Sequence, residues 1–91
     1  MERRLTAVIR GIVQGVSLRW RVTRQAQSLG LRGFIRNEPD GSVRLVAEGP
    51  ERDLQALLDW LARPKHAWDV HEVKLKWSSS RHDFTDFTVQ W

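Results

Sequence analysis

The stretch GFIRNEPDGSVRLVAEG, residues 33–49, has the pattern of a β-hairpin and decides how the rest of the chain can fold. Asp40-Gly41 after Pro39 is a typical residue combination for a tight turn between two strands. One strand is expected near residues 33–38, before the turn, and a second strand follows it. In that second strand the residues expected to face inward are Val43, Leu45 and Ala47, and those expected to face outward are Arg44, Val46 and Glu48.

A helical pattern lies on each side of this hairpin. Before it, the spacing predicts a helix over residues 18–29, with Ser17 as its N-cap and Gly30 as its C-terminal stop. After it, Pro50 predicts the start of a second helix, because proline suits the first helical position, and Pro64 predicts its end. The apolar residues that define the two buried faces are Leu18, Val22, Ala26 and Leu29 in the first helix and Leu54, Leu57, Leu58 and Leu61 in the second.

Segments of alternating apolar and polar residues lie outside the two helices. They predict strands at residues 3–11, 70–77 and 87–91. The resulting order, β-α-β-β-α-β followed by a short C-terminal strand, is the split βαβ pattern of a ferredoxin-like, two-layer α+β sandwich. We therefore expect a single domain over residues 1–91, in which one face of an antiparallel sheet packs on two helices and the other face is open to water.

The composition excludes several classes of protein. The 91 residues include no cysteine, which excludes disulfides, thiol catalysis and cysteine-based metal sites. No apolar run approaches the roughly 20 residues that a membrane span needs, and we expect a cytoplasmic protein. The net charge of +4 favours an anionic partner, such as a small phosphate compound or nucleic acid, although many small domains carry such a charge for solubility.

The segment GIVQGVSLRW, residues 11–20, contains the loop, residues 11–17, that is expected to join the first strand to the first helix. Helix N-termini leave about four backbone N–H groups without partners and carry a partial positive charge. A loop with glycine at position 15 can aim several of these groups at one anion, and Arg19 adds a planar guanidinium that matches phosphate oxygens. The same residues also fit a simple turn beside a surface arginine, and spacing alone leaves both interpretations open.

Further motifs make the sequence resemble the acylphosphatase family over nearly its whole length. They are G-x-V-Q-G-V-x-x-R at residues 11–19, L-G-L-x-G-[aromatic]-[aliphatic]-R-N at 29–37, D-G-x-V at 40–43 and E-G-P at 48–50. The resemblance implies an acylphosphatase, an enzyme that hydrolyses the carboxyl–phosphate bond of small acyl phosphates without metal, cofactor or covalent intermediate. It also implies a role for each site residue: Asn37 orients the attacking water, and the phosphate is held by Arg19 and the backbone amides of Gln14, Gly15, Val16, Ser17 and Leu18.

Two positions depart from the family pattern. Leu18 stands where the family usually has an aromatic residue, which is expected to alter the packing under the loop while leaving the backbone donors available. The segment RPKHAWDV, residues 63–70, replaces the usual glycine and proline pattern before the fourth strand. Neither change touches Arg19 or Asn37.

Two non-catalytic functions remain as alternatives for a basic chain with this strand order. An RNA-recognition domain carries several aromatic residues in one strand, whereas here Arg32-Gly33-Phe34 is followed by none of the later ones. A phosphate-binding module within a larger system is the other alternative. The favoured hypothesis is a monomer that binds a small anionic acyl phosphate, with neither a membrane nor nucleic acid as a partner.

The remaining residues of chemical interest give weaker signals. The three histidines, His66, His71 and His82, lack the spacing of metal ligands. Arg36 is next to Asn37, but strand alternation points it to the opposite face. Most of the tryptophans are expected in or beside the core, with Trp20 and Trp68 as candidates for bordering a substrate site.

Overall fold

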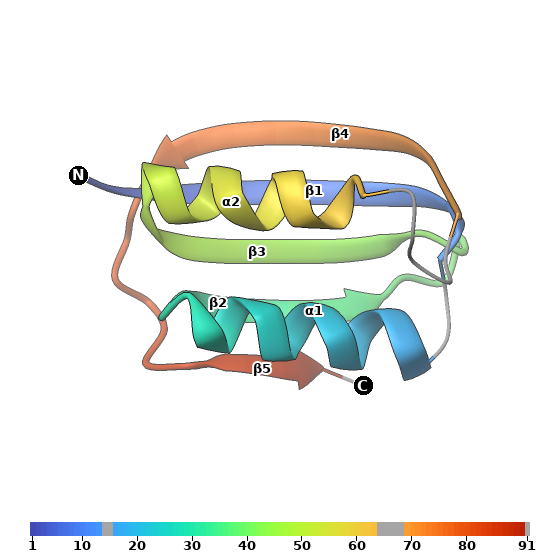
Figure 1. Ribbon diagram of the computed structural model, residues 1–91, viewed down its shortest axis with the longest axis horizontal. Coiled ribbons are helices and arrows are strands. Elements are labelled where there is room, and N and C mark those ends of the chain that lie inside the picture. Colours follow the sequence, from blue (N-terminus) through green and yellow to red (C-terminus); the bar gives the residue numbers. More distant parts are fainter. Residues whose placement is uncertain (14–15, 64–68, 91) are drawn as a thin grey trace.

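The structure, a computed structural model, describes residues 1–13, 16–63 and 69–90, and at residues 12, 16, 17 and 69 it describes the backbone only. Its elements in chain order are β1 (Glu2–Ile12), α1 (Val16–Ser28), β2 (Arg32–Asn37), β3 (Val43–Pro50), α2 (Glu51–Leu61), β4 (Asp69–Ser79) and β5 (Phe87–Gln90) (Figure 1). This is the order that the sequence predicts, including the short strand after the βαββαβ unit.

The strands form one sheet in the order β4-β1-β3-β2-β5. The first four of these pair antiparallel, as predicted, so that Leu5 of β1 lies between Ala47 of β3 and Trp77 of β4. The C-terminal strand β5 pairs parallel to β2, with Ile35 beside Val89. The ferredoxin-like α+β sandwich is therefore confirmed, and β5 adds a parallel edge strand that makes the sheet mixed.

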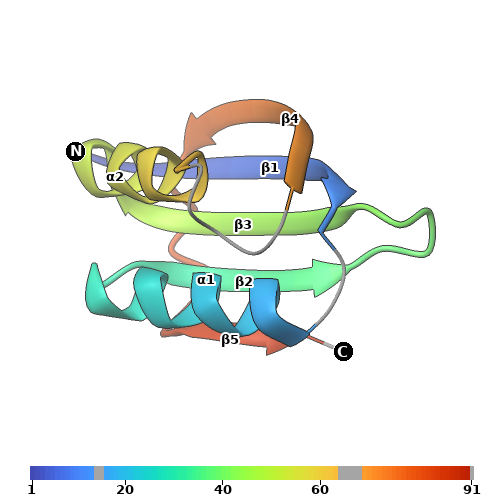
Figure 2. The same cartoon turned by 45° about the vertical axis from the view of Figure 1, so that its right-hand side comes forward.

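Both helices cover the same face of the sheet (Figure 2). Helix α2 contacts β1 and β3, and α1 contacts β2 and β5. The predicted alternation is confirmed on this face, because every second residue of the central strands is buried against the helices. These core residues are Leu5, Ala7 and Ile9 of β1, Val43, Leu45 and Ala47 of β3, Leu18, Val22 and Ala26 of α1, and Leu54, Leu57 and Leu61 of α2.

The ends of α1 show one wrong and one confirmed prediction. The helix begins at Val16, so Ser17 lies inside its first turn and is not the N-cap. At the other end Gly30 has a φ of +71°, and the N–H of Leu31 donates to the Ala26 carbonyl at 3.0 Å. This arrangement ends a helix, because glycine adopts the left-handed conformation with little strain.

Helix α2 begins one residue later than predicted. Pro50 has φ −59° and ψ 140°, an extended conformation that places it at the N-cap, and Glu51 is the first helical residue. Glu51 and Asp53 put negative charge in the first turn, where it stabilises the positive end of the helix. The helix ends at Leu61, and Pro64, predicted to end it, lies outside the described residues.

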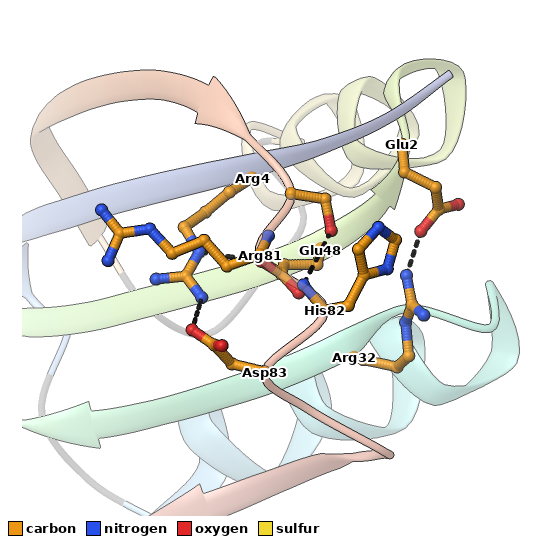
Figure 3. A network of polar contacts seen from close by, with 8 residues as sticks. Glu2, Arg4, Arg32, Glu48, Arg81, His82 and Asp83 are labelled. Carbon is orange, nitrogen blue, oxygen red and sulfur yellow. Dashed lines mark hydrogen bonds and ion pairs between the residues drawn. The ribbon is translucent and has the colours of Figure 1, made fainter.

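The second face of the sheet is partly covered, whereas the sequence predicted that it would be open to water. The connection from β4 to β5, residues 80–86, crosses this face because those two strands lie at opposite edges of the sheet (Figure 3). Its Phe84 packs edge-on against Phe34, with ring centroids 5.8 Å apart. Glu48, predicted to face outward, does lie on this face, but the connection buries it completely.

Candidate active site

Arg19 lies in the first turn of α1 and has only 7% of its surface exposed. Local contacts position it: the Thr23 hydroxyl donates to the Arg19 carbonyl oxygen at 2.8 Å, and the neighbouring Leu18 is part of the core. A guanidinium stays charged at any ordinary pH, and burial protects that charge from screening by salt. Arg19 therefore adds a fixed positive charge at the helix end that already favours anions.

The first turn of α1 also presents backbone donors. Val16, Ser17 and Leu18 are the first three helical residues, and N–H groups at these positions have no acceptor within a helix. Gln14 and Gly15, the other predicted loop donors, lie outside the described residues. Of the predicted phosphate ligands, the structure thus describes Arg19 and the backbone of residues 16–18.

Asn37 is the last residue of β2 and pairs with Val43 across the hairpin. Strand alternation places it on the same face as the buried Ile35, which is the face that the helices cover. Its Oδ1 atom is buried, and no donor among the described residues lies within hydrogen-bond distance of it. A buried amide oxygen that lacks a hydrogen bond costs about 1–3 kcal/mol, so Oδ1 is an acceptor that favours a donor.

The topology brings Arg19 and Asn37 to the same end of the molecule. Strands β1 and β2 both pair antiparallel with β3, which lies between them, so they run in the same direction. The chain therefore enters α1 and leaves β2 at one end of the sheet, as Figures 1 and 2 show. The buried Arg19 and the buried amide oxygen of Asn37, which has no donor within the described ranges, are placed at this end, on the helix-covered side.

A cavity of about 360 Å³ lies between α1 and β5 and includes Arg19 in its wall. Other wall residues are Trp20, Thr23 and Gln27 of α1 and Phe87 and Val89 of β5. Trp20, a sequence candidate for bordering a substrate site, does line this cavity, while Trp68 lies outside the described residues. Sequence reasoning missed the other wall residues, because they meet only where β5 pairs with β2.

Comparison with known proteins now decides the family. The sequence profile of the acylphosphatase family matches residues 5–89. The chain belongs to the acylphosphatase family. It is 42% identical over 86 residues to the acylphosphatase of Paenarthrobacter aurescens (strain TC1), a match that covers 94% of this chain and 92% of the relative. It is 46% identical over 88 residues to the acylphosphatase of Acidothermus cellulolyticus, covering 93% of this chain and 84% of the relative.

A solved structure leads to the same acylphosphatase family. The crystal structure of acylphosphatase from Bacillus subtilis superposes with a TM-score of 0.90 at 28% sequence identity, and the match covers 98% of this chain and 99% of that one. Together with the sequence relatives, this match makes the chain an enzyme of the acylphosphatase class. The substrate class of the family is a small acyl phosphate.

Within this acylphosphatase fold, Arg36 points away from Asn37, as strand alternation predicts. Its Nε donates to Glu38 at 2.9 Å, and its guanidinium lies over the ring of Phe34, 5.4 Å from the centroid. The hydrogen bond from Arg36 is the main cause that lowers the pKa of Glu38. Arg36 therefore belongs to an ion pair on the second face of the sheet, away from the helices, and lies apart from the candidate site.

Other arginines on this second face of the sheet, the face away from the helices, are paired in the same way. Arg4 bonds to Glu48 and Asp83, at 2.9 and 2.8 Å, and Arg10 bonds to Asp40 at 3.1 Å. Carboxylates next to these guanidinium groups weaken the positive field that a nucleic-acid backbone would need. The RNA-binding alternative therefore gains no support from this face.

Metal and membrane features are absent from the part of the chain that the structure describes. Within residues 1–13, 16–63 and 69–90, no three His, Cys, Asp or Glu side chains form a group that could hold a metal ion. His71 and His82 are exposed, and His66 lies outside these ranges. No helix in the same ranges is both long enough and apolar enough to cross a bilayer.

Proposed function

We propose that this acylphosphatase hydrolyses the acyl phosphate by direct attack of water on phosphorus, without metal, cofactor or covalent intermediate. Arg19 and the backbone amides of residues 14–18 hold the phosphate, and Asn37 orients the water. The observation that carries the proposal is that buried Arg19 and Asn37 Oδ1, which has no donor among the described residues, lie at one end of the sheet. We further expect the enzyme to act as a single-domain monomer in the cytoplasm.

The phosphate-binding role follows from the charge that develops during the reaction. Phosphoryl transfer spreads negative charge over three equatorial oxygens, so catalysis needs positioning and electrostatic support more than covalent chemistry. Donors fixed in advance, such as the first-turn amides of α1 and the buried guanidinium of Arg19, supply that support without reorganising.

The role of Asn37 follows from what an amide can and cannot do. It has no useful acid–base pKa, but Oδ1 accepts a hydrogen bond and can fix the water in line with the leaving group. The water oxygen forms a new bond to phosphorus while the bond from phosphorus to the acyl oxygen breaks. The carboxylate leaves with the bonding electron pair and needs no acid, because its conjugate acid has a pKa of about 4. The proton of the water passes to phosphate or solvent.

The first test concerns Arg19. We expect Arg19→Ala and Arg19→Lys to lower kcat by about 10²–10³-fold, because each removes a planar donor to the developing charge. Phosphate release from acetyl phosphate in the presence of EDTA is the measurement, with a phosphate monoester as the comparison substrate. Arg24→Ala is the matched control, since it removes an exposed arginine from the same helix. Near-native activity in both Arg19 variants would remove this residue from the site.

The second test concerns Asn37. We expect Asn37→Ala to lower kcat about 100-fold, because the attacking water loses its orientation. Arg36→Ala is the control, because it alters the neighbouring side chain on the opposite face of the strand. Far-UV circular dichroism establishes that each variant is folded. A kcat for Asn37→Ala equal to that of Arg36→Ala would contradict the proposed water-binding role.

A further inference from the structure

We propose that the cavity between α1 and β5 binds the acyl group of the substrate, and that it favours apolar, unbranched acyl phosphates of about six carbons. Acetyl phosphate and acyl groups with a second negative charge would be poorer substrates. This inference rests on the proposed function, because it takes Arg19 as the residue that holds the phosphate.

The cavity begins at Arg19, a residue that the proposed reaction uses. Arg19 is itself part of the wall. On the opposite wall, Val89 pairs with Ile35, which comes two residues before Asn37 on β2. A phosphate bound at the start of α1 therefore has the cavity on one side. Because the acyl group is joined to phosphate through a single oxygen, it can extend directly into this space.

The cavity wall is chemically suited to hydrocarbon. The rings of Trp20 and Phe87 and the side chain of Val89 are apolar. Two polar groups of the wall have protein partners: the Thr23 hydroxyl donates to the Arg19 carbonyl, and Gln27 Nε2 donates to the Phe87 carbonyl at 3.0 Å. Two further polar wall residues, Asp86 and Thr88, are exposed to water. Trp20 is 58% exposed, so an acyl chain packed on its indole would bury apolar surface that now faces water.

The dimensions of the cavity suit a chain longer than acetyl. Arg19 and Gln27 lie eight residues apart on α1, which corresponds to about 12 Å along the helix axis. The cavity volume of about 360 Å³ is in the range of pockets that bind small organic ligands. A linear acyl chain of about six carbons, together with the phosphate that carries it, fits within this length of about 12 Å.

The charges at the two ends of the cavity differ in sign. Arg19 is at the end near the start of α1, whereas Asp86 lines the cavity next to Phe87, where Gln27 is bonded. The phosphate is therefore attracted to one end only. A second carboxylate at the far end of an acyl chain would approach Asp86, and like charges brought together in this way weaken binding.

The test compares substrates that differ in the acyl chain alone. Acetyl and hexanoyl phosphate release carboxylic acids of similar strength, so the ratio of their kcat/KM values reports binding of the chain. We expect wild-type enzyme to favour hexanoyl phosphate by about tenfold, because several methylene groups are buried. The monophosphate of adipic acid, which ends in a carboxylate, should have a lower kcat/KM than hexanoyl phosphate. Asp86→Asn should reduce the ratio between these two kcat/KM values.

Two variants change the cavity in opposite ways. Trp20→Ala removes part of the wall and Val89→Trp fills the space, and each should lower the preference for hexanoyl phosphate about fivefold. Trp77→Ala is the matched control, because it removes an indole from β4 at the opposite edge of the sheet and should leave the preference unchanged. Equal kcat/KM values for the two substrates in wild-type enzyme, or a preference that survives both cavity variants, would overturn the proposal.

A binding measurement separates failure of this inference from failure of the proposed function. Hexylphosphonate and methylphosphonate carry the same headgroup and are not hydrolysed, so calorimetry measures the contribution of the chain alone. Absence of hydrolysis would reject the proposed function, while tighter binding of hexylphosphonate that is lost in Val89→Trp would still support the cavity. Equal affinity for the two phosphonates would reject the cavity as the chain-binding site.

Discussion

Gly33, a buried residue of β2, has a backbone position that no other amino acid fits. Its φ is +144°, and a Cβ atom placed there would lie 1.9 Å from the carbonyl oxygen of Val46 on the neighbouring strand. Its N–H donates to the Asp86 carbonyl at 2.9 Å, which ties β2 to the residue just before β5. Because Gly33 has no side chain, the backbones of Val46 and Asp86 can both approach it closely.

We predict that Gly33→Ala lowers the free energy of unfolding by about 3 kcal/mol, because it adds both steric overlap and backbone strain. Gly30→Ala is the control: Gly30 also has positive φ, at +71°, but nothing lies within 4 Å of the added atom. We expect Gly30→Ala to lower the free energy of unfolding by about 1 kcal/mol, the cost of the left-handed conformation. Urea denaturation measures both values, and equal losses would show that steric overlap at Gly33 is relieved by a backbone shift.

At the scale of elements, one buried carboxylate holds the connection between β4 and β5 on the sheet. Glu48 Oε2 accepts a hydrogen bond from Arg4 Nε at 2.9 Å and from the backbone N–H of Arg81 at 2.7 Å, as Figure 3 shows. Arg4 also bonds to Asp83, further along the connection, at 2.8 Å. This network therefore ties the connection that leads to β5 onto the sheet.

Replacing the buried carboxylate of Glu48 should lower the free energy of unfolding more than replacing an exposed carboxylate. We predict that Glu48→Gln lowers the free energy of unfolding by about 2 kcal/mol, because hydrogen bonds to a charged group are replaced by weaker neutral ones. Glu51→Gln breaks the exposed pair with Arg3, which has a distance of 2.7 Å, and should cost less than about 1 kcal/mol. Chemical denaturation at pH 7 compares them, and an equal effect of the two substitutions would argue against the network.

At the scale of the whole molecule, three carboxyl groups make stability depend on pH. Burial raises the pKa of Glu48, but the Arg81 N–H and Arg4 outweigh it, so this pKa lies below its usual value. The Ser42 hydroxyl, together with the Ser42 N–H, lowers the pKa of Asp40 to about 2. The pKa of Glu38 is lowered as well. Because the unfolded chain binds protons more readily at these groups, acid favours unfolding.

The sign of this effect leads to a prediction. Stability from the three groups is fully present above about pH 5 and is lost as the pH falls through their folded pKa values, of which that of Asp40 is about 2. We therefore expect the free energy of unfolding to decrease between pH 6 and pH 3. Glu48→Gln should show a smaller decrease, because glutamine does not titrate. Denaturation curves at several pH values test this. An equal decrease in the free energy of unfolding for the wild-type protein and Glu48→Gln would contradict it.

The sequence alone determined the order of the elements and the inner face of the core, and its resemblance to the acylphosphatase family supplied the candidate site residues. The order and the inner face have local signals: alternation in strands, helical spacing and Asp40-Gly41 at the hairpin turn. The ends of the helices were predicted less accurately, since Ser17 lies inside α1 and Pro50 lies outside α2. Moving a helix end by one residue changes the local sequence pattern little. The roles of Arg19 and Asn37 stay predictions that the proposed experiments test.

Tertiary structure alone decided the features that depend on segments far apart in the sequence. These are the parallel pairing of β5 with β2, the complete burial of Glu48 and the cavity beside Arg19. Glu48 occupies an outward strand position, and only the connection from β4 to β5 removes it from water. Similarly, Trp20 and Val89 line one cavity because the last strand reaches the edge beside β2. Local patterns specify which residues face inward, but the packing of distant segments decides which outward residues become covered.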